Sequence, residues 1–151
     1  MKNLIFTLAI LFFVSTGTQA QIAQGTDGKY YDTNNSLYNG TYVEYFANGN
    51  VKLKMALKDG VKEGVSEIYF ENGQMNELRA YSASVKNGDW KIWNEAGQLL
   101  SVAHFINGQK DGNWKVWDEN GKLICDMQYE LGRKIGSWKI YEGASINEKA
   151  F

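Results

Sequence analysis

The stretch that decides the fold is GNWKVWDENGKL, residues 112–123. Residues 114–117 alternate in the manner of a short β-strand. Asn120-Gly121 is a dipeptide typical of a type I′ turn, in which both central residues take positive φ. Residues 123–129 then alternate again as a returning strand. The segment therefore predicts one β-hairpin with Asn120-Gly121 at its turn.

The same segment recurs at an interval of 24 residues. The first glycine series is Gly40, Gly64, Gly88, Gly112 and Gly136, and the second is Gly49, Gly73, Gly97 and Gly121. An aromatic column follows the first series by five residues: Tyr45, Tyr69, Trp93, Trp117 and Tyr141. Agreement between independent columns indicates tandem duplication. It predicts an all-β fold in which 24-residue hairpin repeats, starting at residues 40, 64, 88, 112 and 136, form an elongated, twisted antiparallel meander of about nine or ten strands.

Strand alternation separates two faces of the predicted sheet. With the turn at Asn120-Gly121, Val116 pairs with Cys125 and Trp114 with Met127, on what we call the inner face. The inner face is predicted to include Trp90, Ile92, Leu99, Ala103, Phe105, Leu123, Tyr129, Val51, Leu53, Met55 and Leu57. The opposite, outer face is predicted to hold the aromatic column together with Lys91, Lys115 and Lys139. These aromatic and basic residues are the candidate binding residues.

Three regions follow from the pattern. Residues 1–20 have the features of a secretory signal peptide, with Lys2 before an uncharged run and small Thr18 and Ala20 before the expected cleavage point. As a helix the run over residues 4–14 rises about 17 Å, short of the roughly 30 Å hydrocarbon core that an anchor must cross. Residues 21–39 form a polar N-terminal segment with a capping strand, and residues 40–151 form the repeat domain.

Composition excludes several kinds of function. The 151 residues carry 16 Lys+Arg against 17 Asp+Glu, which leaves no basic surface for nucleic acid or for strong membrane binding after signal cleavage. One Cys and one His supply no disulfide framework and few transition-metal ligands, so neither a metal nor a cofactor is predicted. His104 and Ser101 have no third group to orient them as a catalytic triad, so no enzyme is predicted. The lone Cys125 is predicted to be buried, the alternative being an intermolecular thiol partner.

Residues 112–123, followed by Tyr129, Gly132 and the next Gly136, resemble the bacterial variant of the MORN repeat. That variant occurs in tandem in YwqK-like antitoxin proteins, and the resemblance covers roughly residues 40–141. It implies a β-hairpin repeat array that acts in protein association.

The leading hypothesis is an exported, non-enzymatic protein, periplasmic or extracellular in a bacterium, whose aromatic face binds another protein or serves as a scaffold. Two alternatives remain open. One is an envelope glycan or cell-wall module in which Trp93 and Trp117 stack on sugar rings. The other is an antitoxin-like immunity protein against a secreted toxin.

Overall fold

The computed structural model describes residues 21–143 and 145–151, so the predicted signal peptide lies outside the described residues. All regular structure in this part is β. The strands are β1 (Ala23–Gln24), β2 (Tyr30–Tyr31), β3 (Gly40–Tyr45), β4 (Val51–Lys58), β5 (Val61–Tyr69), β6 (Met75–Ser82), β7 (Val85–Trp93), β8 (Leu99–Ile106), β9 (Gln109–Trp117), β10 (Leu123–Glu130), β11 (Arg133–Glu142) and β12 (Ser145–Ala150).

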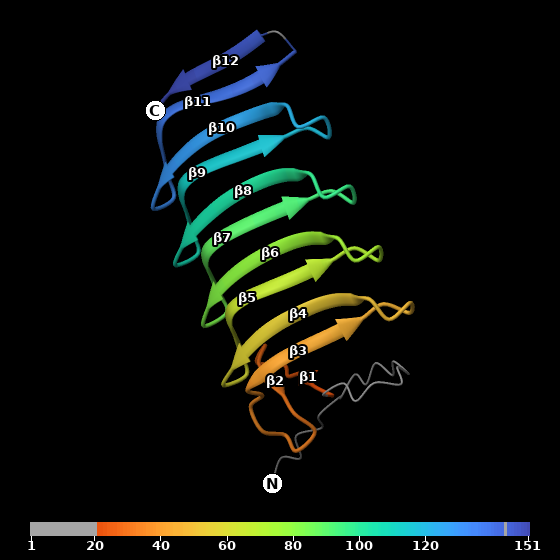
Figure 1. Cartoon of the computed structure of the whole chain (residues 1–151). Coiled ribbons are helices and arrows are strands. Elements are labelled where there is room, and N and C mark those ends of the chain that lie inside the picture. The colour runs from red at the N-terminus through yellow and green to blue at the C-terminus, as the bar shows by residue number, and fades with distance from the viewer. Residues whose placement is uncertain (1–20, 144) are drawn as a thin grey trace.

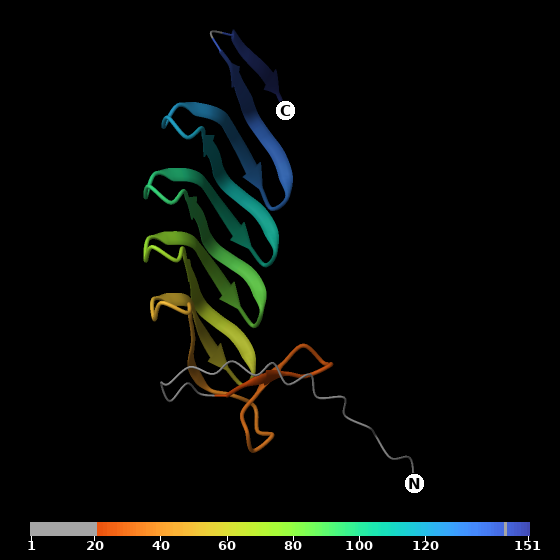
Figure 2. The ribbon, with the colours of Figure 1, turned by 90° about the vertical axis from the view of Figure 1, so that its right-hand side faces the viewer.

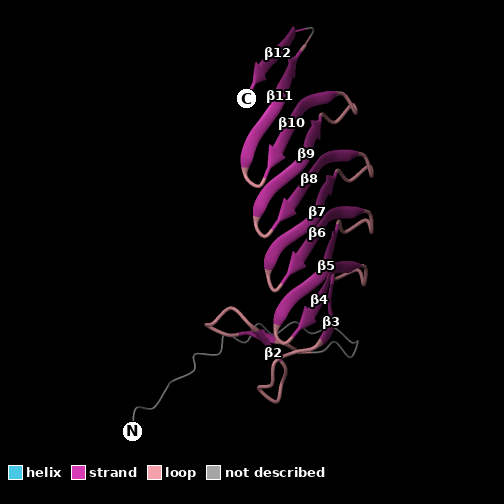
Figure 3. Ribbon diagram, turned by 90° about the vertical axis from the view of Figure 1, so that its left-hand side faces the viewer, coloured by secondary structure: helices cyan, strands magenta, loops and turns pink. Residues whose placement is uncertain are grey.

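Strands β3 to β12 form one ten-stranded antiparallel sheet in which every strand pairs with its neighbours in sequence. Figure 1 shows them stacked in chain order from β3 to β12. The views turned to either side show a single layer of curved strands (Figures 2 and 3). The predicted twisted meander of hairpin repeats is confirmed. The final hairpin is completed by β12, which pairs with β11.

Two kinds of turn alternate along the array, and the type I′ prediction for Asn120-Gly121 is wrong. In that turn only Gly121 has positive φ, at 77°. The turn is wider, because the Gly121 amide donates to the Asp118 carbonyl while the Asp118 side chain accepts from the amides of Asn120 and Lys122. An Asp at the start and a Gly at the end of a four-residue turn explain this geometry better than the dipeptide alone.

The type I′ turns instead connect one hairpin to the next. Both central residues have positive φ in Asp59-Gly60, Ala83-Ser84, Asn107-Gly108 and Leu131-Gly132. These tight turns lie at one end of the strands and the wider turns at the other end (Figure 1). Because primed turns match the right-handed twist of paired strands, they let the hairpins follow one another without a break in the sheet.

The pairing of Val116 with Cys125 and of Trp114 with Met127 agrees with the prediction. A bulge beside each wide turn changes which face of the sheet the residues next to that turn occupy. It places Val51, Leu99 and Leu123 directly opposite Tyr45, Trp93 and Trp117, on the outer face, so the prediction that these three aliphatic residues lie on the inner face is wrong. One extra residue in a strand shifts the residues beyond it to the other side.

The described hydrophobic side chains that are buried all lie on the inner face: Met55, Leu57, Phe105 and Tyr129. No second layer of the described chain covers the sheet (Figure 2). Contacts between side chains on adjacent strands must therefore supply much of the stability.

The segment before β3 packs against the first tight turn. The Tyr30 amide donates to the Gly60 carbonyl at 2.8 Å, and the Gly60 amide donates to the Tyr38 carbonyl at 2.9 Å. Gly60 is buried there against Leu37. Burial also raises the pKa of Tyr30, which keeps its hydroxyl neutral. These contacts tie the short β1–β2 pair to the β3 end of the array (Figure 1).

Candidate binding faces

The outer face carries the predicted aromatic column as one residue on every second strand of the sheet, from β3 to β11. Neighbouring members are therefore about 9.6 Å apart. Each has an aliphatic residue directly opposite on the next strand, giving the pairs Tyr45–Val51, Tyr69–Met75, Trp93–Leu99, Trp117–Leu123 and Tyr141–Ile146. Tyr45 is 46% exposed and the other four aromatic residues are half-buried. We call these five pairs the outer row.

Tyr69 shows how the outer row is held. Its hydroxyl donates to Glu67 Oε2 at 3.1 Å. Burial, and then this carboxylate, raise the pKa of Tyr69, so its hydroxyl stays protonated and able to donate. The side chain presents an apolar ring with a polar tip, a combination enriched at protein interfaces.

The predicted lysines stand beside the outer row, and each is matched by a carboxylate. The Nζ atoms of Lys91, Lys115 and Lys139 lie 3.6, 2.7 and 3.9 Å from the nearest carboxylate oxygens. Their partners are Asp89, Asp126 and Glu148. The outer face is therefore aromatic and close to neutral along this line. Lys115 and Lys139 pair with carboxylates on the next strand and Lys91 pairs with one on its own strand, so none of the three presents free positive charge.

The inner face carries a second and more continuous aromatic set. Seven rings follow one another from β6 to the last residue of the chain: Tyr81, Trp90, Phe105, Trp114, Tyr129, Trp138 and Phe151. Successive centroids are 4.9–5.6 Å apart, and the planes are inclined to one another by 54–69°. Edge-to-face and tilted contacts of this kind are the favourable arrangements for aromatic pairs. We call this set the inner ladder.

The three tryptophans of the inner ladder also close backbone gaps. A bulge interrupts the pairing of the two strands on either side of a tight turn. At three of these bulges an indole N–H donates to a carbonyl on the preceding strand, ten residues earlier in the chain. Trp90, Trp114 and Trp138 donate to the carbonyls of Ala80, His104 and Gln128 at 3.1–3.2 Å. A bulge interrupts the ladder of backbone hydrogen bonds, so a side-chain donor at this place satisfies an acceptor that would otherwise lack one.

Four lysines, spaced 24 residues apart in the sequence, lie over the rings of the inner ladder. Lys62 lies over Tyr81, Lys86 over Trp90 and Phe105, Lys110 over Trp114 and Tyr129, and Lys134 over Trp138 and Phe151. Their Nζ atoms are 4.3–5.1 Å from the ring centroids, within the range of cation–π attraction. This lysine column was not among the predicted binding residues. Its signal was a lysine two residues before each glycine of the first series from Gly64 onward.

His104 and Ser101 lie on opposite faces, because His104 pairs with Asp89 on the outer face and Ser101 pairs with Ile92 on the inner face. His104 Nδ1 is 2.8 Å from Asp89 Oδ1. This contact, and then the charge of Lys91, hold the pKa of Asp89 below its ordinary value of 3.8. The stabilising contribution of the Asp89 carboxylate is therefore present above that value and is lost as the pH falls through the lowered pKa.

We expect His104→Val to raise the pKa of Asp89 toward its ordinary value, since the variant removes the hydrogen bond that lowers it most. A carbon-detected NMR titration of the Asp89 carboxyl group measures the midpoint directly. Lys91→Gln is the control and should raise the midpoint less, because Lys91 is the weaker cause at 3.6 Å. A larger rise in the Lys91 variant would contradict this ranking.

Cys125 is half-buried on the inner face and is not the buried residue that was predicted. Burial, followed by the nearby Asp126 carboxylate, raises the pKa of its thiol. The protonated thiol, which is the unreactive form, is therefore favoured at neutral pH.

Within residues 21–143 and 145–151, no cluster of three or more His, Cys, Asp and Glu side chains could hold a metal ion. The same residues include no helix long and apolar enough to cross a membrane.

Comparison with known proteins identifies the architecture. The family model described as "MORN repeat variant" matches residues 38–59, 62–82, 86–107 and 110–130, which together are more than half of the chain. No curated protein gives a match. The matched segments follow the successive hairpins from β3 to β10, and the last hairpin continues the same geometry. The chain belongs to the MORN repeat variant family.

Proposed function

We propose that this protein is an exported, non-enzymatic repeat protein that binds another protein, or serves as a scaffold, through the outer row. The observation that carries the proposal is the recurrence of an aromatic residue opposite an apolar one on all five hairpins of one sheet. A row of aromatic rings with polar tips, beside lysines already paired with carboxylates, offers apolar contact area with little unbalanced charge. Contact surfaces of this composition suit protein partners.

Export, and the finer family assignment, are parts of the same proposal. The charged start, apolar run and small residues of residues 1–20 support cleavage after Ala20 and placement in the periplasm or outside a bacterial cell. The segment over residues 112–123 supports the bacterial, YwqK-like subtype. An antitoxin-like role would then require a toxin encountered outside the cytoplasm.

The test is retention of a partner from bacterial envelope extract on the immobilised protein. We expect Trp93→Ala combined with Trp117→Ala to lower the amount of the retained partner about tenfold or more, because central aromatic residues dominate binding energy at interfaces. Far-UV circular dichroism and urea unfolding establish that the variant is folded. The matched control is Val85→Ala with Leu131→Ala, which removes two exposed apolar side chains at or beside the tight turns, away from the outer row.

Two outcomes would redirect the proposal. Equal retention by the double tryptophan variant and the wild type would remove the outer row from the binding surface. Binding on a glycan array that is lost in the same variant would favour the alternative, in which Trp93 and Trp117 stack on sugar rings.

A further inference from the structure

The lysines over the inner ladder differ from those on the outer face in their charge balance. Lys91, Lys115 and Lys139 each have a carboxylate within ion-pair distance. Within the described part of the chain, no ion pair joins Lys86, Lys110, Lys134 or Lys149 to a carboxylate. All four side chains are exposed. The inner face therefore presents a line of positive charge that the protein does not neutralise itself.

These ammonium groups are held in place before any ligand arrives. Lys86 Nζ lies 4.3 Å from the Trp90 centroid, and Lys110 Nζ lies 4.3 Å from that of Trp114. Lys134 Nζ is at the same distance from Trp138. Cation–π attraction and packing along the aliphatic stems restrict the rotamers of these lysines. Binding a ligand then costs less ordering of side chains than it would on free lysines.

The row of residues next to the inner ladder is uncharged from β7 to β12. It runs Ile92, Ser101, Val116, Cys125, Ile140 and Asn147, each opposite the next across the sheet. Ile92 and Ile140 are 40% and 44% exposed. A ligand that meets the lysines with carboxylates thus also meets a strip suited to apolar groups.

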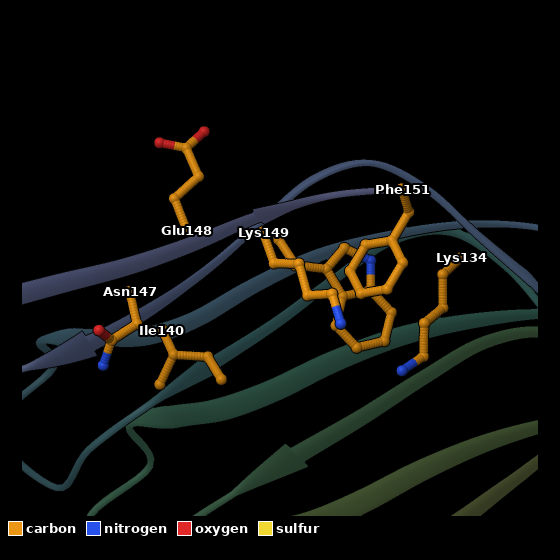
Figure 4. Close-up of a pocket in the computed structure, with 7 residues that line it drawn as sticks. Lys134, Ile140, Asn147, Glu148, Lys149 and Phe151 are labelled. Atoms are coloured by element: carbon orange, nitrogen blue, oxygen red, sulfur yellow. The ribbon is translucent and has the colours of Figure 1, made fainter.

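The end of this surface is hollowed. Lys134, Trp138, Lys149 and Phe151 line a cavity of about 310 Å³ beside β12. Figure 4 shows the amino ends of both lysines beside the Phe151 ring, while Glu148 points away. Here, too, the positive groups and the rings face the same space.

The spacing of the lysines indicates the shape of the ligand. Lys86, Lys110 and Lys134 recur on every second strand, about 9.6 Å apart. A polyproline II helix repeats every three residues at 3.1 Å each, which is about 9.3 Å, and it places every third side chain on one side. In an ordinary extended strand, residues three apart point in opposite directions. A carboxylate at every third residue of a polyproline II segment can therefore meet successive lysines.

We propose that the inner face binds an acidic, proline-rich segment of another protein in the polyproline II conformation. Each carboxylate pairs with one of Lys86, Lys110 and Lys134, while the intervening proline rings lie along the uncharged row. This site is on the opposite face from the outer row. Either proposal can therefore fail without the other, because each is tested with its own ligand and its own variants.

The probe is a fluorescein-labelled peptide of six Glu-Pro-Pro repeats, titrated with the purified protein and followed by fluorescence anisotropy. A peptide of the same composition, with its six glutamates together and its prolines following, is the spacing control. A peptide of six Gln-Pro-Pro repeats is the charge control. We expect the regularly spaced acidic peptide to bind at least about tenfold more tightly than either control. Neither control can form the three ion pairs with Lys86, Lys110 and Lys134, and each surface ion pair raises the affinity about threefold.

The triple variant Lys86→Gln, Lys110→Gln, Lys134→Gln should weaken binding of the acidic peptide about tenfold or more. Replacing the same three lysines with arginine keeps the charge and the ring contact, so this variant should still bind. The matched control is Lys54→Gln, Lys58→Gln, Lys122→Gln, which removes as much charge away from the inner ladder. Lys54 and Lys58 alternate with Met55 and Leu57 and hence point to the outer face, and Lys122 lies at a wide turn. This control variant should change the affinity less than about threefold.

The proposal would be overturned by no binding of the spaced peptide, by equal binding of either control peptide, by equal weakening in the two glutamine variants, or by loss of binding in the arginine variant with the fold intact. Binding of phosphatidylglycerol vesicles in place of the peptide would also overturn it and would identify a membrane surface as the ligand. Circular dichroism of every variant separates loss of the site from loss of the fold.

Discussion

Replacing Trp114 with alanine should lower the free energy of unfolding by about 3 kcal/mol, the low end of the range for large aromatic side chains, since Trp114 is half-buried. The indole stands in the middle of the inner ladder, with centroids 5.1 Å from Phe105 and 5.3 Å from Tyr129. It also donates to the His104 carbonyl and lies under the Lys110 ammonium group. Urea unfolding followed by circular dichroism measures the loss.

Two further variants show how much of that loss comes from the hydrogen bond and how much is specific to the inner ladder. Trp114→Phe keeps a ring but removes the indole N–H, so it should cost about 1 kcal/mol, the net value of one hydrogen bond. Tyr45→Ala removes an exposed ring from the outer row and should change stability by less than about 1 kcal/mol. If Trp114→Ala cost no more than Tyr45→Ala, the inner ladder would not be a main source of stability.

Gly60→Ala should destabilise the protein by about 3 kcal/mol and release the segment before β3. Gly60 has φ +73°, and left-handed backbone costs an alanine about 1–2 kcal/mol. A Cβ atom there would also lie 2.8 Å from both Leu37 Cδ2 and the Tyr30 carbonyl oxygen. Crowding of this kind adds about 1–3 kcal/mol. Urea unfolding gives the total, and limited proteolysis of residues 21–39 reports whether the segment has come loose.

Gly49→Ala is the matched control for the crowding. Gly49 has a similar φ of +88°, but no atom lies within 4 Å of the position of its Cβ. It should lose only the backbone contribution and leave residues 21–39 resistant to the protease. Equal losses in the two variants would mean that the N-terminal segment does not rest on Gly60.

The repeat architecture could be predicted because its signals are local and periodic. Each first-series glycine from Gly64 onward, such as Gly88 or Gly112, adopts positive φ at a bulge, so no other residue serves there as well and the interval of 24 residues stands out. Alternation around Trp114 and Val116 then gave the correct pairing with Met127 and Cys125. Neither conclusion needed knowledge of distant contacts, since every strand of the sheet pairs with its neighbour in sequence.

The errors arose where one residue decides between two geometries. Asn120-Gly121 suits a two-residue turn, yet the Asp118 carboxylate accepts two backbone amides and favours the wider turn. The bulge that accompanies the wider turn moved Leu99 and Leu123 to the outer face. Dipeptide preference is weaker than a side chain that satisfies two backbone donors.

The candidate site was only partly predictable. The outer row could be found because aromatic residues in a fixed column are conspicuous. Lysines such as Lys86 and Lys110 are common on the exposed face of any strand. That their ammonium groups lie over rings of the inner ladder depends on contacts between strands, which the three-dimensional structure shows. Whether a lysine is paired depends on neighbours across the sheet, as the contrast between Lys110 and Lys115 shows.

Pairing only between consecutive strands has a consequence for how such a protein can change in length. Inserting or deleting a whole 24-residue unit at a tight turn would put the same kinds of residue back beside one another, so the rings of the inner ladder would stay in phase. A gain or loss of any other size would set the two halves of the array out of step. Gene duplication can therefore adjust the reach of this surface in steps of two strands without redesigning any contact within it.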